Sequence, residues 1–308
     1  MGKIGIAIHG GAGPDSPFIK SNVDGYREGL KEAITSAYKF LQEGKPAIDV
    51  VEEAVRKLED NPLFNAGRGS AVNNRGEVEM DASIMDGKTL KAGAVSMVRN
   101  VKNPITLARA IMEKTNHILL SGYGALDFAR DMRDIDIELE ADAYFITEHQ
   151  YDEYMEVRDK ENLQDLFRKY IRGTVGAVAL DKDGNLAAAT STGGTTNSLA
   201  GRIGDSCLIG AGCYANNKTC AVSGTGDGEF LISGVIAHSI ASAIEYLHCS
   251  MQEACDFVVH KKNKDVPGNI GVISINGKGE FGISYNSSRM HRAWISDDEP
   301  LHIISYKD

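Results

Sequence analysis

Strands and helices are expected in separate groups along this chain, and this order limits the folds that it can adopt. An apolar strand over residues 3–8 precedes two helices, over 23–41 and 46–62, whose apolar side chains recur with helical spacing. Elements grouped in this way bury their apolar faces when helices pack outside stacked sheets. We therefore predict an α+β fold with helices outside two sheets. The other predicted elements are strands over 77–85, 92–98, 175–180 and 186–190, helices over 104–114, 122–132, 229–247 and 251–262, and several C-terminal strands.

The length of the chain allows one large domain or two ordinary ones. It has 308 residues, of which 42% are hydrophobic and 25% charged, which is typical of a globular protein. No internal repeat or low-complexity linker separates two parts. A stretch dense in charge, residues 130–172, ends abruptly at Gly173-Thr174, where an apolar strand begins. We predict a single domain over residues 1–308.

The charge and cysteine content argue against several classes of protein. A formal net charge of -10 repels phosphate backbones, so we expect no nucleic-acid partner. The longest weakly polar stretch, 230–244, contains several serines and lies between Glu229 and Glu245, which favours a buried helix over a membrane span. Five cysteines without a C-x-x-C pair, and an N-terminus too weakly apolar for a signal peptide, indicate reduced thiols in the cytoplasm.

No motif for a catalytic cofactor is evident. The spacings of zinc ligands are absent. The glycine-rich segment 9–13 (HGGAG) follows a strand, but it matches neither the dinucleotide-binding nor the phosphate-binding loop pattern. A tight turn that lets other backbone approach closely is the better interpretation of this segment. We therefore expect no cofactor for catalysis.

Two threonines face each other in the predicted hairpin over residues 174–192. If its turn is centred on Asp183, Leu180 lies opposite Leu186, and by the same count Thr174 lies opposite Thr192. Directly opposed residues have Cβ atoms about 4.5–5.5 Å apart, close enough for two hydroxyls to share a hydrogen bond. Taken alone, such a pair is ordinary sheet packing.

The junction before this hairpin changes that interpretation. Gly173 ends a long charged segment, and a glycine permits strained backbone and leaves its carbonyl unshielded, as self-cleavage requires. Cleavage there would give Thr174 a free α-amino group, whose unperturbed pKa of about 7.7–8.0 suits a general base near neutral pH. Thr174 would then supply both nucleophile and base, without a Ser-His-Asp set.

Two downstream loops carry further candidate residues. Arg202 and Asp205 lie three residues apart in a glycine-flanked loop and could hold the carboxylate and the ammonium of an amino acid, or could simply pair with each other. The loop over residues 223–228 (SGTGDG) precedes a helix. Its backbone N–H groups could stabilise an oxyanion, or the loop could serve only as the helix N-cap.

These motifs together resemble one family. The chain is similar to the plant-type L-asparaginases and isoaspartyl peptidases, which are N-terminal nucleophile hydrolases. The similarity extends nearly end to end, through segments beginning at residues 9 (HGGAG), 61 (NPLFNAGRGS), 77 (EVEMDASIMDG), 173 (GTVGAVALD), 190 (TSTGG), 201 (GRIGDS), 210 (GAGCYANN) and 290 (MHRAW).

The resemblance implies an αββα four-layer sandwich that cleaves itself between Gly173 and Thr174, giving an α subunit of residues 1–173 and a β subunit of residues 174–308. It also implies roles for the candidate residues. Thr174 would be the nucleophile and Thr192 the hydroxyl that orients it. The remaining implied roles are an active-site amide on Asn65, an oxyanion contribution and cavity lining from Thr225 and Gly226, and binding of the substrate's α-carboxylate and α-amine by Arg202 and Asp205.

The implied reaction is hydrolysis of the side-chain amide of L-asparagine, or of the isopeptide bond of β-aspartyl dipeptides, with release of L-aspartate. The small-molecule substrate would be the main partner, and the family suggests a homodimer of cleaved protomers. The loop over 58–68 resembles one that binds a structural sodium ion through backbone carbonyls, which suit hard cations. The carbonyls implied are those of Leu58, Glu59, Asn61, Phe64, Ala66 and Arg68.

Two alternatives remain at this stage. A glycosylasparaginase shares the core motifs but belongs to secretory or lysosomal compartments, and a binding protein of this fold would stay uncleaved. The chain also departs from the usual family pattern, with Cys207 in place of a proline and Arg289 in place of a smaller residue. A bulky Arg289 near the site is expected to admit acidic leaving residues or to narrow the pocket.

Overall fold

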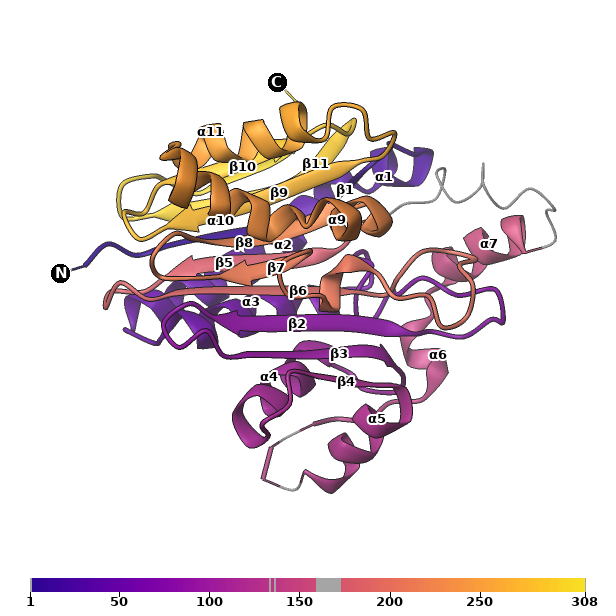
Figure 1. Ribbon diagram of the computed structural model, residues 1–308. Helices are drawn as coiled ribbons and strands as arrows, with labels where there is room; N and C mark the ends of the chain where they lie inside the picture. The colour runs from indigo at the N-terminus through magenta and orange to yellow at the C-terminus, as the bar shows by residue number, and fades with distance from the viewer. Residues whose placement is uncertain (1, 133, 136, 159–172, 308) are drawn as a thin grey trace.

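Two stacked sheets form the centre of the molecule. The computed structural model describes residues 2–132, 134–135, 137–158 and 173–307. An eight-stranded sheet has the order β12-β11-β1-β5-β6-β2-β3-β4, and a four-stranded sheet has the order β10-β9-β8-β7 (Figure 1). All neighbouring strands are antiparallel except the β3–β4 pair.

The elements have the following bounds. The strands are β1 (Gly5–Gly13), β2 (Met80–Asp86), β3 (Ala92–Val98), β4 (Leu119–Ser121), β5 (Val175–Leu180), β6 (Leu186–Thr192), β7 (Cys213–Ala215), β8 (Cys220–Gly226), β9 (Ile270–Asn276), β10 (Phe281–Tyr285), β11 (Arg289–Ser296) and β12 (His302–Tyr306). The helices are α1 (Pro17–Ser21), α2 (Val23–Gln42), α3 (Ala47–Asp60), α4 (Pro104–Lys114), α5 (Gly122–Asp131), α6 (Asp142–Phe145), α7 (Glu148–Val157), α9 (Gly228–Gly234), α10 (Ile236–Leu247) and α11 (Met251–Asp256). Two short helices are η1 (Asp205–Cys207) and η2 (Phe257–Lys262).

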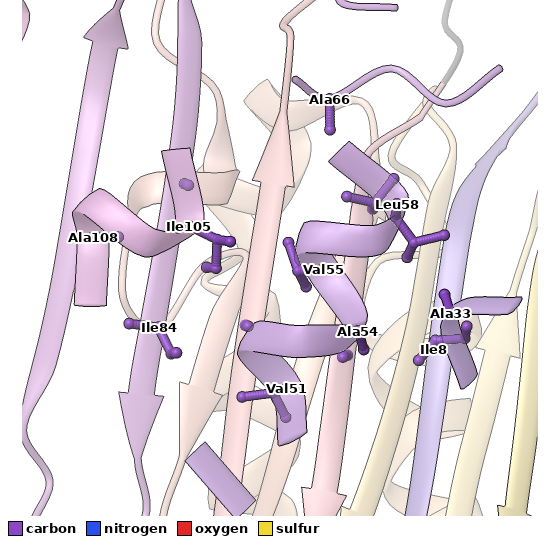
Figure 2. Close-up of a cluster of buried hydrophobic side chains, with 14 of the residues drawn as sticks. Ile8, Ala33, Val51, Ala54, Val55, Leu58, Ala66, Ile84, Ile105 and Ala108 are labelled. Atoms are coloured by element: carbon purple, nitrogen blue, oxygen red, sulfur yellow. The ribbon is translucent and has the colours of Figure 1, made fainter. Parts of the chain in front are cut away.

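Helices α2, α3 and α4 cover the outer face of the large sheet. Their apolar stripes follow the predicted helical spacing, and Pro46 and Pro104 precede or begin helices where their fixed φ is compatible. Figure 2 shows side chains from these helices, such as Val55 and Ile105, meeting Ile8 and Ile84 of the sheet in one buried cluster. This cluster is the largest part of the core.

Two further apolar layers complete the molecule. Side chains of β5 and β6, including Val178 and Ala188, pack against Ile273 and Ile275 of β9 between the two sheets. Helices α10 and α11 cover the other face of the small sheet through Ile240 and other buried side chains. The order is therefore helices, sheet, sheet and helices, which confirms the α+β fold class and the four-layer arrangement expected from the sequence.

The hairpin β5–β6 has the register that its turn predicts. Leu180 lies opposite Leu186, and the pairing continues to Val175 opposite Ser191. Thr174 precedes β5 by one residue, and Thr192 ends β6. The carboxyl end of β6 and the residues just before β5 therefore lie at the same edge of the large sheet.

Some boundaries differ from the sequence prediction. The HGGAG segment is the end of strand β1 with a register shift between His9 and Ala12, and is not a separate turn. Residues 77–79 lie outside β2, which begins at Met80. The last of the predicted helices is α-helical only to Asp256, after which the wider η2 follows. Part of the charged stretch, residues 159–172, lies outside the described residues.

The predicted helix over 229–247 is divided into two. Val235 has a left-handed φ of 48°, which is rare for a β-branched residue, and it separates α9 from α10. By length and composition alone, Gly228–Leu247 is the one helical stretch in the described ranges that could cross a membrane, with a mean hydropathy of 1.5. Only one side of it is buried, because Tyr246 and Leu247 are exposed while Ile240 packs on the small sheet. The helix expected to be buried is thus buried only in part, on the side that packs against the small sheet.

Candidate active site

A cavity opens where the first residue before β5 meets the end of β6. Its empty space is about 270 Å³, the open mouth included. Six of the eight residues predicted for catalysis, cleavage and substrate binding line it. The lining residues are Gly173, Thr174, Thr192, Gly194, Thr195, Arg202, Gly204, Asp205, Gly226 and Gly228.

The backbone of Thr174 is held on both sides by hydrogen bonds. Its N–H donates to Thr225 Oγ1 at 3.1 Å, and its carbonyl oxygen lies 2.8 Å from His9 Nδ1. The hydroxyl of Thr225 also accepts the N–H of Ala12, so this threonine joins β8 to the end of β1. Thr225 is fully buried and, like Asn65, is not among the described residues that line the cavity, so the expectation that Thr225 lines it is wrong.

A hydroxyl within hydrogen-bond distance of the Thr174 hydroxyl comes from Ser206, a residue that the sequence analysis did not select. Thr174 Oγ1 lies 3.4 Å from Ser206 Oγ, whereas Thr192 Oγ1 accepts the N–H of Gly194 at 3.2 Å. Between Thr174 and Thr192, both of which are described, no hydroxyl–hydroxyl bond forms, although the register brings them to the same edge. Ser206 directly follows Asp205 in the GRIGDS segment, and this neighbourhood is the one feature of the sequence that could have indicated it as a site residue.

The amide of Asn65 contacts the carbonyl that precedes Thr174. Asn65 Nδ2 donates to Gly173 O at 3.1 Å and to Gly194 O at 2.7 Å, while its Oδ1 accepts the N–H of Ala71. Gly173 has a φ of 89°, and a Cβ there would collide with the backbone of Gly11. Only glycine fits this position without strain.

Two carboxylates of the segment before and within β2 hold the loop that carries Arg202. Glu79 Oε2 accepts the N–H of Gly201 at 2.8 Å, and Asp81 Oδ2 accepts the N–H of Gly204 at 3.0 Å. Arg202 is itself paired with Glu229 through two hydrogen bonds, at 2.9 and 3.0 Å. A planar guanidinium bound in this way is oriented as well as paired.

Asp205 is a buried carboxylate with one free oxygen. Its Oδ2 is buried and has no hydrogen-bond partner within the described part of the chain. Burial raises the pKa of Asp205 to about 7, the charge of Arg202 opposes this shift, and the charges of Asp81 and Glu229 add to it. An unpartnered buried oxygen beside the cavity can accept a hydrogen bond from a ligand, and an ammonium group would also satisfy its charge.

The loop of the implied sodium site is compact and rich in close backbone contacts. A Cβ at Gly67 would meet the carbonyl oxygen of Glu59 at 2.5 Å, and one at Gly69 would meet that of Phe64 at 2.6 Å. Three of the six implied carbonyls, those of Leu58, Glu59 and Asn61, accept backbone N–H groups and keep a second lone pair. Among the described side chains, no cluster of three or more acidic, histidine or cysteine residues could hold a metal. The loop thus offers carbonyl oxygens, which fit sodium.

Comparison with known proteins decides the family. Residues 2–304 match the family described as asparaginase. This chain belongs to the asparaginase family. It is 45% identical over 304 residues to an isoaspartyl peptidase of Escherichia coli (96% of this chain, 93% of the relative), and 43% identical over 302 residues to an isoaspartyl peptidase/L-asparaginase of Xenopus laevis (98% and 94%). An isoaspartyl peptidase/L-asparaginase of Homo sapiens is 43% identical over 302 residues (98% and 96%). The predicted family is therefore confirmed, and it is one of N-terminal nucleophile hydrolases.

Two departures from the usual family pattern lie apart from the cavity wall. Arg289 is buried and donates through Nε to the carbonyl of Pro14 at 3.1 Å, and it is not among the described residues that line the cavity. The expectation that Arg289 narrows the pocket directly is therefore wrong. Cys207 is also buried, and burial raises the pKa of its thiol, so that this asparaginase-family chain carries a neutral thiol there.

Proposed function

We propose that this chain is an autocleaving threonine hydrolase that acts on the side-chain amide of L-asparagine and on the isopeptide bond of β-aspartyl dipeptides, releasing L-aspartate. One observation carries the proposal: Thr174, Arg202 and Asp205 line the same small cavity, and Asp205 Oδ2 has no hydrogen-bond partner among the residues that the structure describes. The names of the relatives support the substrate class, since several are isoaspartyl peptidases or L-asparaginases.

The first reaction is cleavage of the chain itself between residues 1–173 and 174–308. Thr174 Oγ attacks the carbonyl carbon of Gly173, the C–N bond breaks, and the proton of the hydroxyl passes to the departing nitrogen. Water then hydrolyses the resulting ester and leaves a carboxylate on Gly173. Asn65, which donates to Gly173 O, polarises this carbonyl and stabilises the oxyanion as it forms. Ser206, whose hydroxyl lies 3.4 Å from the attacking oxygen, relays the proton.

The second reaction uses the amine that cleavage releases. The α-amino group of Thr174 accepts the hydroxyl proton while Oγ attacks the side-chain carbonyl of the substrate, and the proton passes to the leaving ammonia or amine. The β-aspartyl ester that remains is hydrolysed by water activated by the same amine. Gly226, which lines the cavity, and Thr225, whose hydroxyl accepts the N–H of Thr174, are the residues to which we assign stabilisation of the oxyanion.

Substrate recognition follows from charge. Arg202 binds the α-carboxylate in a bidentate manner, for which it must share its guanidinium with Glu229. Asp205 accepts a hydrogen bond from the α-ammonium through Oδ2, for which the described part of the chain supplies no partner. Because both α groups must be free, isoaspartate inside a longer chain is a substrate only at its N-terminus.

The test is the intact mass of freshly purified protein under denaturing conditions, followed by substrate assays. We expect two fragments that meet at Gly173 and Thr174, and release of aspartate from asparagine and β-aspartyl dipeptides. Thr174→Ala should abolish both cleavage and hydrolysis, whereas the matched control Thr89→Ala, on an exposed turn, should change neither. A Thr174→Ala protein that still hydrolyses substrate would exclude this mechanism.

The same experiment separates the alternatives. A glycosylasparaginase would release aspartate from an asparagine that carries N-acetylglucosamine on its amide, and would prefer it to a β-aspartyl dipeptide. A non-catalytic binding protein would remain a single chain after long incubation and still bind aspartate. Either result would replace the proposal.

We also propose that a structural sodium ion binds the backbone carbonyls of the loop from Leu58 to Arg68, without taking part in catalysis. The close approach of Gly67 and Gly69 to the carbonyls of this loop supports the site. Because an ion that binds only the folded state raises stability, the thermal midpoint should be higher in sodium chloride than in choline chloride of equal concentration. Equal midpoints would contradict the site.

Assembly and compartment are proposed on less specific grounds. We propose a homodimer of cleaved protomers in the cytoplasm. Exposed apolar side chains at the β4 end of the large sheet, namely Ile118, Leu119 and Tyr123, support an interface, and the five free cysteines support a reducing compartment. Light scattering and cell fractionation test these two statements. A monomer or a secreted protein would contradict them.

A further inference from the structure

A buried histidine connects the carbonyl of Thr174 to the second sheet. His9 Nδ1 lies 2.8 Å from Thr174 O, and His9 Nε2 lies 2.9 Å from Ser223 Oγ of β8. Gly176 is paired with His9 in the large sheet, and a Cβ at Gly176 would collide with the Ser223 hydroxyl and the His9 ring. The missing side chain at Gly176 therefore leaves the space in which the two sheets make this contact.

The contact continues through a second hydroxyl to a carbonyl. Ser223 Oγ lies 2.7 Å from Thr190 Oγ1, which in turn lies 3.0 Å from Gly212 O. The series has four contacts and a carbonyl at each end, and carbonyls only accept. A neutral histidine, a serine and a threonine can each donate one proton. The three protons make three of the four contacts hydrogen bonds, so one contact has no proton.

The contact with Thr174 O decides how we assign the ring proton. Because Thr174 O cannot donate, the 2.8 Å contact is a hydrogen bond only when the proton lies on Nδ1, and we assign this tautomer; Ser223 then donates to Nε2. The single proton of Thr190 goes either to Gly212 O or to Ser223 Oγ. Burial lowers the pKa of His9 to about 3, so the ring is neutral near neutral pH and serves as a donor to Thr174, not as a general base.

We propose that His9 is a positioning residue that fixes the Thr174 carbonyl, and thereby the direction of the Thr174 hydroxyl, in the cleaved enzyme. This inference rests on the proposed function of Thr174. In the uncut chain, peptide bonds on both sides hold Thr174 in place. Cleavage frees its nitrogen side and makes it a chain terminus, and a terminus is ordered only when it is tied down. His9 then holds the one backbone carbonyl that this residue retains.

Two substitutions of His9 separate its two contacts. The side-chain nitrogen of asparagine stands near the place of histidine Nδ1, and that of glutamine near the place of Nε2. His9→Asn therefore keeps the donor to Thr174 O, and His9→Gln keeps the contact with Ser223. His260→Asn and His260→Gln, at an exposed helical histidine, are the matched controls.

The measurement is kcat and KM for asparagine, with the autocleavage rate of each variant. A lost hydrogen bond of ordinary strength predicts about a tenfold lower kcat for His9→Gln, and a loss of about threefold or less for His9→Asn. KM should stay within about twofold of wild type, because Arg202 and Asp205 are untouched. Autocleavage should slow less than hydrolysis in His9→Gln, since Thr174 is still held from both sides in the uncut chain.

The possible failures can be told apart. A wild-type protein that neither cleaves nor hydrolyses would overturn the proposed function, and this inference with it. An active wild type whose His9→Gln variant hydrolyses as fast as His9→Asn, or loses cleavage and hydrolysis equally, would overturn the inference alone. If both His9 variants fail to fold, Ser223→Ala decides: we expect a kcat lowered about twofold to fivefold with unchanged KM, and an unchanged kcat would overturn the inference.

Discussion

Replacing Asn65 should slow the cleavage of the chain more than any other change outside Thr174 itself. The side chain of Asn65 has two N–H donors and one carbonyl acceptor, and all three are used. One donor points at Gly173 O, the oxygen that would become negative in the proposed attack by Thr174. Asn65→Ala removes this donor together with the bonds to Gly194 and Ala71.

The size of the effect follows from the geometry. Removing one donor from an oxyanion site costs about 2.7–4 kcal/mol, or roughly 10²–10³ in rate. The Asn65–Gly173 contact is 3.1 Å in the uncut chain, at the long end for such a bond. We therefore expect the lower value, about a 100-fold slower autocleavage for Asn65→Ala. Asn65→Asp should be slower still, because it sets a carboxylate against two carbonyl oxygens.

The assay is the time course of the two fragments by intact mass, begun as soon as the chain is synthesised. Asn116→Ala, at an exposed asparagine in a loop, is the matched control and should cleave at the wild-type rate. An Asn65→Ala protein that cleaves within threefold of wild type would refute the role of this amide, as would an Asn65→Asp protein that cleaves faster than Asn65→Ala.

Three further predictions concern recognition and stability. Burial raises the pKa of Asp205 to about 7, so its carboxylate becomes neutral as pH falls through that value. The KM for asparagine should therefore rise about tenfold from pH 8 to pH 6. Steady-state KM values that do not change with pH would contradict this. Asp81→Asn should weaken the hydrogen bond to the N–H of Gly204 and raise KM about tenfold. The autocleavage rate should stay within twofold of wild type, because Asp81 positions Arg202 and not the scissile bond. Equal losses in hydrolysis and autocleavage would contradict this role. Ile84→Ala, in the fully buried cluster of Figure 2, should lower the free energy of unfolding by about 2–5 kcal/mol in denaturant titrations, and a loss below 1 kcal/mol would mean that the cluster repacks.

Local patterns predict the parts of the fold in which neighbours in sequence are also neighbours in space. The register of β5 and β6 follows from the turn at Asp183 and from alternation, and the structure has Leu180 opposite Leu186 as expected. Helices α2 and α3 follow in the same way from apolar spacing, and Pro46 precedes α3. The break at Val235 has no such signal, because a β-branched residue with positive φ runs against its intrinsic preference and is imposed by tertiary contacts.

The contacts within the site join distant segments and could not be found by pattern. His9 and Ser223 are 214 residues apart, Asn65 and Gly173 are 108 apart, and Thr174 and Ser206 are 32 apart. The resemblance to the family supplied Asn65 as a candidate. It did not indicate which atom the amide contacts, and it gave no role to Ser206. The two hairpin threonines, whose hydroxyls could have shared a hydrogen bond, do not form one. Opposition in a register sets the Cβ positions and leaves each hydroxyl free to bond another partner.

The strand order of the large sheet has a consequence for what the molecule can do once it has been cut. Strand β1, from the first piece, lies between β11 and β5 of the second, and β6 of the second lies beside β2 of the first (Figure 1). Cleavage between Gly173 and Thr174 would therefore leave two interlaced polypeptides that cannot separate without unravelling the sheet. Folding before the cut is a unimolecular event. Refolding after denaturation would instead require the two polypeptides to meet, so recovery of activity would depend on protein concentration. The stability of the cleaved enzyme would then be kinetic, set by a slow rate of unfolding.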